Sequence, residues 1–373
     1  MKKILFLIKT LNIGGAERVL VDISNHLAAA GYEVTVQTLL DEGKYRDMLS
    51  KDVVYRRGLP FSSLFMQKIF LRLLMILPPI ILGNLLIRRK YTHVVGFTEG
   101  LPTKIIGGYL SNKSKKIAWV HTDLYMNYAS GNVFATARRN RACYDSFDRV
   151  VCVSKDAKKG YERRIGQHKK EVIVQYNPLD KAEIIRKSNE IATYPVTRNE
   201  GLNLVAVGRL EEVKGFDLLI EAMGIVRNSI NQALRLYIIG DGSQNESLDH
   251  LIDAYGLKDV VHLCGSQINP YSIMRKCDLQ IIPSRAEGYP LVLCEGHFLG
   301  LPVVSTKCTG PTEIIEDSKG GILVDISAAA LADGIIKMVN DKALFNKCKE
   351  EVIAWSERYD ENEVYRQIES IFD

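Results

Sequence analysis

Cysteine and histidine are scarce in this chain, and neither occurs at the spacing of a metal site. The 373 residues include seven cysteines and seven histidines. The cysteines are odd in number and irregularly spaced, which argues against a disulfide framework and for a reducing compartment. No Cys-x-x-Cys or His-x-x-x-His pair occurs, so a structural zinc site is not expected.

Two further absences exclude other classes of protein. No Gly-x-Gly-x-x-Gly fingerprint follows the first strand-like run, which counts against an enzyme that uses NAD or FAD. The amino-terminal apolar core, residues 4–8, is shorter than the roughly 7–15 residues of a secretory signal, so we expect a buried strand there and a cytoplasmic protein. What remains is an ordinary globular composition, 46% hydrophobic and 25% charged, with a length that favours two domains.

Strand-like and helical runs alternate along the chain, a pattern typical of parallel sheets with right-handed crossovers. The predicted fold class is therefore α/β, with two Rossmann-like domains. The strand-like runs are residues 4–8, 34–38, 93–97, 116–120 and 150–153 in the first half, and residues 202–207, 234–239, 260–263, 279–282 and 303–305 in the second.

A domain boundary is predicted at Asn177-Pro178, where the last apolar run of the first half ends and a polar segment begins. Near the carboxy terminus, a helical pattern is broken at about Asp360. The predicted parts are an amino-terminal domain over residues 1–178, a linker over 179–200, a carboxy-terminal domain over 201–355 and a carboxy-terminal helix over 356–373.

The most informative stretch contains two carboxylates, Glu287 and Glu295, on either side of a predicted loop-to-helix junction. Pro290 suits the first position of that helix, where its missing N–H has no consequence. Because helix N-termini bind anions, a diphosphate can be held there, with ribose hydroxyls at Glu295. Two glutamates eight positions apart also occur by chance, so a plain solvated loop is the alternative. The donor-binding residues predicted here are Glu295, Gly288, Tyr289, Pro290 and Leu291.

Two cations, Arg209 and Lys214, lie on either side of the turn after the strand-like run 202–207. Arginine offers a planar fork to a phosphate and lysine a point charge, so both suit one anion at a helix start. The alternative is that both side chains are only solvated.

Together with three other segments, these elements resemble the retaining glycosyltransferases of family 4, and the resemblance covers nearly the whole chain. It implies the GT-B fold, in which two Rossmann-like domains face each other across a cleft and the carboxy-terminal helix crosses back to the first domain. The resemblance also implies transfer of a hexosyl unit from a nucleotide diphosphate sugar to a hydroxyl, with retention of configuration. The matching segments are residues 11–18, 208–215, 240–242, 287–295 and 309–315.

The resemblance implies a role for each predicted catalytic residue, namely Glu287, His121, Arg209 and Lys214. Glu287 binds the sugar, and His121, just after the strand-like run 116–120, contacts it near the reaction centre. Arg209 and Lys214 stabilise the negative charge that grows on the leaving phosphate. No Asp-x-Asp occurs, so the metal site of the other major transferase fold is not indicated, and neither a metal nor another cofactor is expected. Thr98 and Glu99 follow the preceding strand-like run, and the same argument for a ligand contact is weaker for them.

Two glycine-containing loops are further candidates for donor binding. Gly14 and Gly15 follow the first strand-like run and let a backbone approach a ligand closely, although a plain tight turn also explains them. The loop with Gly265 and Gln267 is expected to contact the base through backbone groups. We favour a UDP-sugar over GDP-mannose.

Charge is divided unevenly between the two halves. Residues 1–180 hold 29 Lys and Arg against 15 Asp and Glu, a net charge of +14, and the remainder has a net charge of −9. A basic half indicates an anionic partner, and nucleic acid is disfavoured because no recognised binding motif accompanies the cations.

The basic half also contains the apolar segment Leu64 to Lys90, which Pro78-Pro79 interrupts. It is too short on either side to span a membrane, for which about 20 residues are needed. We expect it to dock on an anionic membrane surface, on the inner face of the membrane, and a helix packed against the first sheet is the alternative.

The expected partners are thus a nucleotide-sugar donor and a lipid-linked or oligosaccharide acceptor. Two other functions stay open at this point: a sugar-nucleotide epimerase of the same fold, and a non-catalytic glycan-binding module. The epimerase would need no acceptor, and the module would need no cationic diphosphate site.

Overall fold

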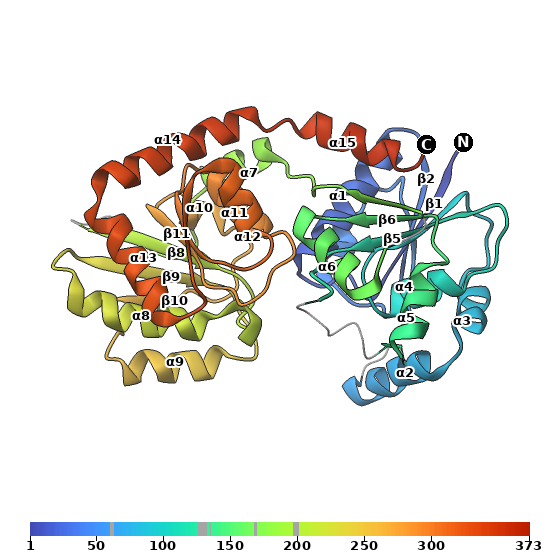
Figure 1. Cartoon of the computed structure of the whole chain (residues 1–373), viewed down its shortest axis with the longest axis horizontal. Helices are drawn as coiled ribbons and strands as arrows, with labels where there is room; N and C mark the ends of the chain where they lie inside the picture. Colours follow the sequence, from blue (N-terminus) through green and yellow to red (C-terminus); the bar gives the residue numbers. More distant parts are fainter. Residues whose placement is uncertain (60–62, 126–132, 135, 168–169, 197–200) are drawn as a thin grey trace. The chain divides into compact units, whose positions relative to one another are not determined.

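The chain forms two compact units, each built on a parallel sheet (Figure 1). The computed structural model describes residues 1–373 except 60–62, 126–132, 135, 168–169 and 197–200. Unit 1 comprises Met1–Pro178 together with Glu361–Asp373, and unit 2 comprises Leu179–Asp360.

Within the described residues of unit 1, seven parallel strands form one sheet in the order β3-β2-β1-β4-β5-β6-β7. The central strands are almost wholly apolar and buried, as expected for a parallel sheet covered on both faces. Strand order reverses between β1 and β4, and the carboxyl ends of strands at such a reversal are where open α/β sheets bind ligands. The strands are β1 (Lys3–Ile8), β2 (Glu33–Thr38), β3 (Val54–Arg56), β4 (His93–Gly96), β5 (Lys115–Val120), β6 (Arg149–Cys152) and β7 (Glu171–Val174).

The helices of unit 1 include one from the far end of the sequence, α15 (Glu361–Ser370). After it, Phe372 is fully buried, with its ring 5.9 Å from that of Phe6 in β1. His26 stacks on Tyr365 at 3.9 Å, and its Nε2 lies 2.6 Å from Glu369. The other helices are α1 (Gly15–Ala29), η1 (Lys44–Met48), α2 (Leu64–Ile76), α3 (Pro79–Leu86), α4 (Leu101–Gly108), α5 (Ala137–Tyr144) and α6 (Lys155–Ile165).

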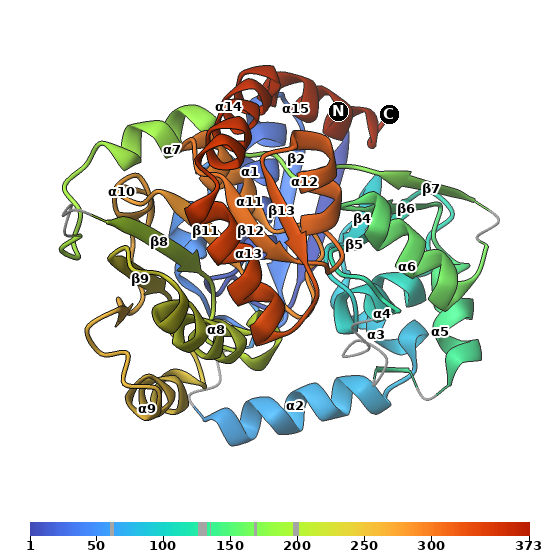
Figure 2. The same cartoon turned by 60° about the vertical axis from the view of Figure 1, so that its left-hand side comes forward.

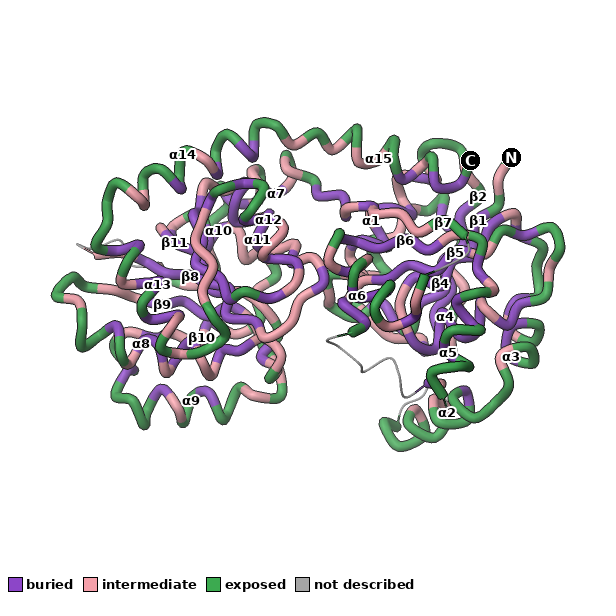
Figure 3. Tube along the Cα trace, in the orientation of Figure 1, coloured by how far each residue is buried: buried purple, intermediate pink, exposed green. Residues whose placement is uncertain are grey.

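Helix α2 is apolar but mostly exposed, whereas α3 packs closely on α4 (Figures 1 and 3). A Cβ at Gly83 in α3 would lie 2.4 Å from the backbone nitrogen of Tyr109, so only glycine permits this approach. The buried Lys104 donates to the carbonyl of Leu74 at 3.1 Å and to that of Met75 at 2.5 Å. Lys104 therefore caps the carboxyl end of α2 and fixes it to unit 1.

Unit 2 has a six-stranded parallel sheet among its described residues, in the order β10-β9-β8-β11-β12-β13. Its order reverses between β8 and β11. Helices α8 (Phe216–Ser229) and α13 (Ala328–Asn340) lie side by side against one large apolar cluster (Figure 2). The strands are β8 (Leu202–Val207), β9 (Leu234–Ile239), β10 (Val261–Leu263), β11 (Leu279–Ile282), β12 (Val303–Thr306) and β13 (Gly321–Val324).

The remaining elements of unit 2 correct one expectation. The predicted linker over 179–200 contains helix α7 (Lys181–Ser188), whose Ile184 is buried in the apolar cluster around Trp355. The sequence there is polar because α7 buries only one face; residues 197–200 lie outside the described residues. The other helices are η3 (Glu212–Lys214), α9 (Asn245–Ala254), α10 (Tyr271–Met274), α11 (Leu291–Phe298), α12 (Pro311–Ser318) and α14 (Lys342–Arg358).

Candidate active site

The reversal of strand order in unit 2 brings together two of the predicted catalytic residues. Lys214 follows β8, Glu287 follows β11, and these strands are neighbours at the centre of the sheet. Lys214 Nζ lies 2.5 Å from Glu287 Oε1, which also accepts a hydrogen bond of 2.8 Å from the Ser284 hydroxyl. The two charged side chains are 22% and 12% exposed, so the pair is largely shielded yet reachable from solvent. The carboxyl ends of such strands are where open α/β sheets bind ligands.

A close backbone contact and a second ion pair hold these two loops together. Gly215 has φ +67°, and a Cβ at this position would lie 2.1 Å from the carbonyl oxygen of Pro283. Arg285 donates to both carboxylate oxygens of Asp217, at 2.7 and 2.6 Å. Burial opposes ionisation of Asp217, but the hydrogen bond from Arg285 is strong enough to lower the pKa of that carboxyl. This clamp was not predicted from the sequence, although Arg285 stands two residues before Glu287.

A third loop, after β12, supports the backbone of the Glu287 segment. The Thr309 hydroxyl donates to the Glu287 carbonyl at 2.6 Å. Gly310, with φ +82°, packs so closely that an added Cβ would lie 2.7 Å from the Gly288 carbonyl oxygen. The segment 309–315 of the family resemblance therefore has a physical role here, which is to fix the loop that carries the carboxylate.

The predicted donor-binding residues after Glu287 lead into helix α11. Pro290 is the N-cap rather than the first helical residue, which is Leu291, so the helix begins one position later than expected. Gly288 is buried and Tyr289 half-buried. The Leu293 amide donates to the Pro290 carbonyl at 3.0 Å, and the start of the helix presents the positive end of its dipole, which suits an anion. Tyr271 was not predicted as a site residue, and its hydroxyl donates to Glu295 Oε1 at 2.9 Å.

Glycines line the carboxyl edge of the neighbouring strands. A Cβ at Gly240 would lie 1.8 Å from the Gly208 carbonyl oxygen, and the Gly240 amide donates to the Gly265 carbonyl at 3.0 Å. Gly265 has φ +66° and open space where a side chain would be. Gln267 donates to the Cys264 carbonyl and accepts from the Thr193 hydroxyl, both at 2.5 Å, so its side chain is engaged within unit 2.

Arg209 is the one predicted catalytic residue of unit 2 that is not joined to the others. Its side chain is exposed, and in the part of the chain that the structure describes it has no ion pair with Glu287 or with any other carboxylate. No group of three His, Cys, Asp or Glu residues in the described ranges could hold a metal ion.

The remaining predicted residues lie in unit 1, at the carboxyl ends of β1 and β5. Gly14 is the N-cap of α1 and Gly15 its first residue, with the Glu17 carboxylate folded against Gly14. His121 follows β5, its ring centroid 4.8 Å from that of Phe97. Burial lowers the pKa of His121 to about 3, so its imidazole is neutral at physiological pH.

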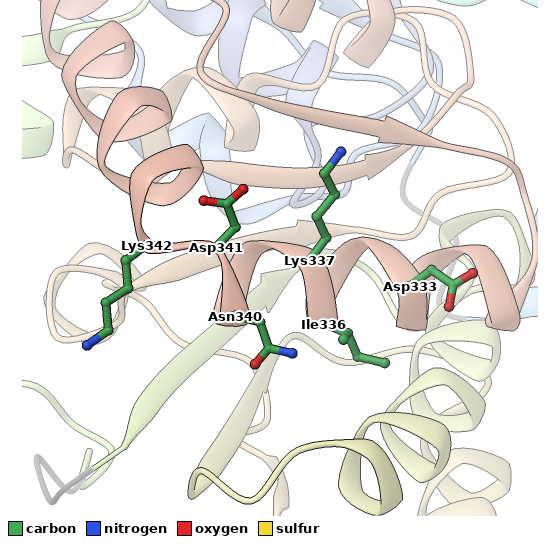
Figure 4. A pocket seen from close by; sticks show the side chains of 6 residues that line it. All are labelled: Asp333, Ile336, Lys337, Asn340, Asp341 and Lys342. Atoms are coloured by element: carbon green, nitrogen blue, oxygen red, sulfur yellow. The ribbon is translucent and has the colours of Figure 1, made fainter.

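A surface hollow of about 470 Å³ lies elsewhere in unit 2, where α13 meets α14 (Figure 4). None of the predicted site residues lines it. The lining residues are Asp333, Ile336, Lys337, Asn340, Asp341 and Lys342.

Comparison with known proteins matches both parts of the chain. The group described as "Glycosyl transferases group 1" matches residues 189–355, and "Glycosyltransferase Family 4" matches residues 13–183. Anabaena HepE, solved in complex with UDP and glucose, has a similar fold, with a TM-score of 0.74 and 19% identity over 100% of this chain and 99% of HepE.

Two relatives align over most of their length. The lipopolysaccharide core biosynthesis glycosyltransferase LpsD of Rhizobium meliloti is 25% identical over 89% of this chain and 86% of its own. The GalNAc-α-(1→4)-GalNAc-α-(1→3)-diNAcBac-PP-undecaprenol α-1,4-N-acetyl-D-galactosaminyltransferase of Campylobacter jejuni is 26% identical over 94% of this chain and 93% of its own. With these matches and the sheets of its two units, the chain is a glycosyltransferase of the GT-B fold and belongs to the group 1, family 4 glycosyltransferases.

Proposed function

We propose that this glycosyltransferase moves a hexosyl unit from a UDP-sugar to a hydroxyl of a lipid-linked or growing glycan, with retention of anomeric configuration. The observation that carries the proposal is the Lys214–Glu287 pair at the centre of the unit 2 sheet. UDP is favoured because HepE, which shares the fold, was solved with UDP and glucose. A lipid-linked acceptor is favoured because the relative from Campylobacter jejuni is named for an undecaprenol-linked one.

The chemistry of the pair divides between a cation and a carboxylate. As the bond between the sugar and the leaving group breaks, negative charge grows on the outer phosphate. Lys214 and the positive amino-terminal end of α11 stabilise that charge, with Arg209 as an additional exposed cation. These cations make a bound metal unnecessary in the proposed mechanism. Glu287, held by Ser284 and Thr309, binds the sugar hydroxyls and stabilises positive charge at the anomeric carbon.

Ligand binding tests the donor class. UDP, GDP and ADP are added separately, and the shift in unfolding temperature is measured for each. A ligand that binds only the folded state stabilises it by about 2.7 kcal/mol at a concentration one hundred times its dissociation constant. We expect a shift with UDP and its sugar conjugates and none with GDP. A shift with GDP alone, or with none of the three, would contradict the UDP-sugar proposal.

Steady-state kinetics test the role of the carboxylate. Glu287→Gln is expected to lower kcat by about 10²-fold or more, because only the charge is removed, while the affinity for UDP changes little. Glu316→Gln, an exposed glutamate of the same unit, is the matched control and should leave both unchanged. Equal losses of kcat and UDP affinity would make Glu287 a binding residue only.

A labelled donor incubated without acceptor identifies the epimerase if a rearranged nucleotide sugar accumulates.

We also propose that the protein is cytoplasmic and docks on an anionic membrane through the segment Leu64 to Lys90. In the described residues no single helix is long and apolar enough to span a membrane. Helices α2 and α3 together have the length and the apolar composition of a span, but their axes are bent by 118° at the break between them. Large apolar side chains on α2 are exposed, including Leu64 at 73%, Phe65 at 70% and Ile76 at 79%. A long exposed apolar helix in a basic unit fits an interfacial role.

The cations that would face the lipid headgroups come from several elements of unit 1. Exposed cations stand on α2, after α3 and on α5, a helix that packs on α4. Each cation near an anionic surface contributes about 1 kcal/mol to binding. The residues are Lys68, Arg72, Arg88, Arg89, Lys90, Arg138, Arg139 and Arg141.

Vesicle flotation tests the docking proposal. The wild type is expected to float with vesicles that contain anionic lipid and much less with neutral ones, and the double variant Phe65→Ser/Ile76→Ser is expected to stay unbound. Ile191→Ser changes an apolar residue of unit 2 that is 95% exposed and serves as the control. A wild type that does not bind anionic vesicles, or a double variant that still binds them, would overturn the proposal.

A further inference from the structure

Glu99 is a half-buried carboxylate with no part in the proposed chemistry. It lies just after β4, beside the reversal of strand order in the unit 1 sheet. Gly100 follows it with φ +84° and ψ −125°, a conformation that residues with a side chain rarely adopt. Burial raises the pKa of Glu99 above the ordinary value for glutamate. A carboxylate held in such a place needs strong hydrogen-bond donors around it.

Three donors converge on one oxygen of Glu99, and all three belong to the turn after β5. Glu99 Oε1 accepts hydrogen bonds from the backbone N–H of His121 at 2.6 Å, from that of Thr122 at 2.8 Å and from the Thr122 hydroxyl at 3.1 Å. The side chain therefore links the ends of two neighbouring strands. It fixes the backbone of the residue whose imidazole was predicted to contact the sugar.

The imidazole of His121 is held in a defined tautomer. It makes a hydrogen bond with the backbone of Phe97, whose ring also packs against it at 4.8 Å. Nε2 is buried and has no hydrogen-bond partner among the described residues. In a neutral imidazole the nitrogen that bonds to a carbonyl carries the proton, so Nε2 presents a lone pair. An unsatisfied buried acceptor of this kind calls for a hydroxyl or N–H donor, which a bound sugar can supply.

We propose that Glu99 is a positioning residue, which holds the His121–Thr122 turn so that Nε2 of His121 accepts a hydrogen bond from a hydroxyl of the donor hexosyl group. This inference rests on the proposed function. Without the carboxylate, two backbone amides and one hydroxyl lose their acceptor, so the contacts with Phe97 are left to orient a ring whose backbone is less constrained. Glu99 itself does not touch the sugar in this proposal; it acts through His121.

A double-mutant cycle tests whether Glu99 acts through His121, with donor kcat/KM as the measurement. Glu99→Leu removes the acceptor with little change in volume, Glu99→Gln keeps an acceptor oxygen, and His121→Ala removes the imidazole. We expect Glu99→Leu and His121→Ala each to lower kcat/KM at least tenfold, and Glu99→Gln to stay within about threefold of the wild type. Residues that act as a unit give non-additive effects, so the double variant Glu99→Leu/His121→Ala should be no worse than His121→Ala alone. Losses that multiply would overturn the proposal.

A readout independent of activity separates this inference from the proposed function. Nitrogen-detected NMR of the histidine rings reports the tautomer, and the His121 signals are assigned by their loss in His121→Ala. We expect a single Nδ1–H tautomer in the wild type and in Glu99→Gln, and a mixture in Glu99→Leu. A single unchanged tautomer in Glu99→Leu would overturn the positioning role. If the protein transfers no sugar from any UDP-sugar while the tautomer still responds to Glu99, the proposed function fails and the positioning of the ring stands.

Where Glu99→Leu does not fold, Thr122→Val replaces it in both experiments. This variant removes only one of the three donors to Glu99. We expect a smaller loss of kcat/KM that disappears in the His121→Ala background. A loss of the same size in that background would contradict the proposal.

Discussion

Replacing Gly215 by alanine is expected to destabilise unit 2 and to disturb the Lys214–Glu287 pair, whereas the same change at Gly256 should be mild. The two glycines have nearly the same positive φ, +67° at Gly215 and +63° at Gly256. They differ in space: an added Cβ meets the Pro283 carbonyl oxygen at 2.1 Å at Gly215, and nothing within 4 Å at Gly256. The comparison therefore separates backbone conformation from steric contact.

The two contributions can be estimated. A residue with a side chain in the left-handed conformation costs roughly 1–2 kcal/mol, and this term is common to both variants. Forcing a group into a packed site costs roughly 1–3 kcal/mol more, and this term applies to Gly215→Ala alone. We expect a loss of about 1–2 kcal/mol for Gly256→Ala and about 3–4 kcal/mol for Gly215→Ala.

Tryptophan fluorescence isolates the response of unit 2. The chain has two tryptophans, Trp119 in unit 1 and Trp355 in unit 2, so a Trp119→Phe background leaves a reporter in unit 2 only. Urea unfolding is followed in that background, and donor kinetics are measured without it. Only Gly215→Ala should lower kcat, because Lys214 is its neighbour. Equal losses of stability in the two variants would refute the steric argument.

Three further predictions concern pH, the cap of α2 and metal removal. Burial lowers the pKa values of His93 and His297 to about 4, so between pH 6.5 and 4 the unfolded state binds protons that the folded state does not. The free energy of unfolding therefore decreases as the pH is lowered, by about 2 kcal/mol per histidine at pH 5. Thermal unfolding at pH 7 and pH 5 should show a smaller loss of stability on acidification for His297→Gln than for the exposed His250→Gln. Lys104→Met leaves two carbonyls of α2 without their donor, so amide hydrogen exchange in α2 should accelerate by a factor that corresponds to about 1–3 kcal/mol, with no change in unit 2. Turnover should survive dialysis against EDTA, and a loss that Mg²⁺ or Mn²⁺ restores would contradict the metal-independent mechanism.

The fold class could be predicted from sequence because the central strands are long apolar runs. β1 and β8 are inner strands of parallel sheets that are covered on both faces, and their residues are almost all buried. The edge strands β3, β7 and β13 were missed because they are short and only partly buried, which weakens the apolar signal. Helix α7 was missed for a similar reason, since a polar helix that buries one face resembles a linker in composition.

Within the site, the motifs identified Lys214, Glu287 and the supporting segment 309–315, but not Ser284 or the Arg285–Asp217 clamp. A pairing between positions 73 residues apart depends on the strand order, which the alternation of elements does not specify. The Arg285–Asp217 clamp and the three donors to Glu99 are likewise tertiary contacts. In the sequence Arg285 and Asp217 look like ordinary surface charges, and nothing marks Thr122 as a partner of Glu99. The membrane segment and the donor base rest on chemistry outside the chain, so they stay predictions.

The burial of Phe372 against β1 has a consequence for biosynthesis. The ribosome makes residues 1–178 first, yet the core of unit 1 around Phe6 lacks a ring until the chain has been translated to position 372. Unit 2 is contiguous in sequence and can close as soon as it has left the exit tunnel. Nascent unit 1 therefore exposes an apolar site beside β1 for the whole time that unit 2 is being translated, and chaperone protection during synthesis is most needed there.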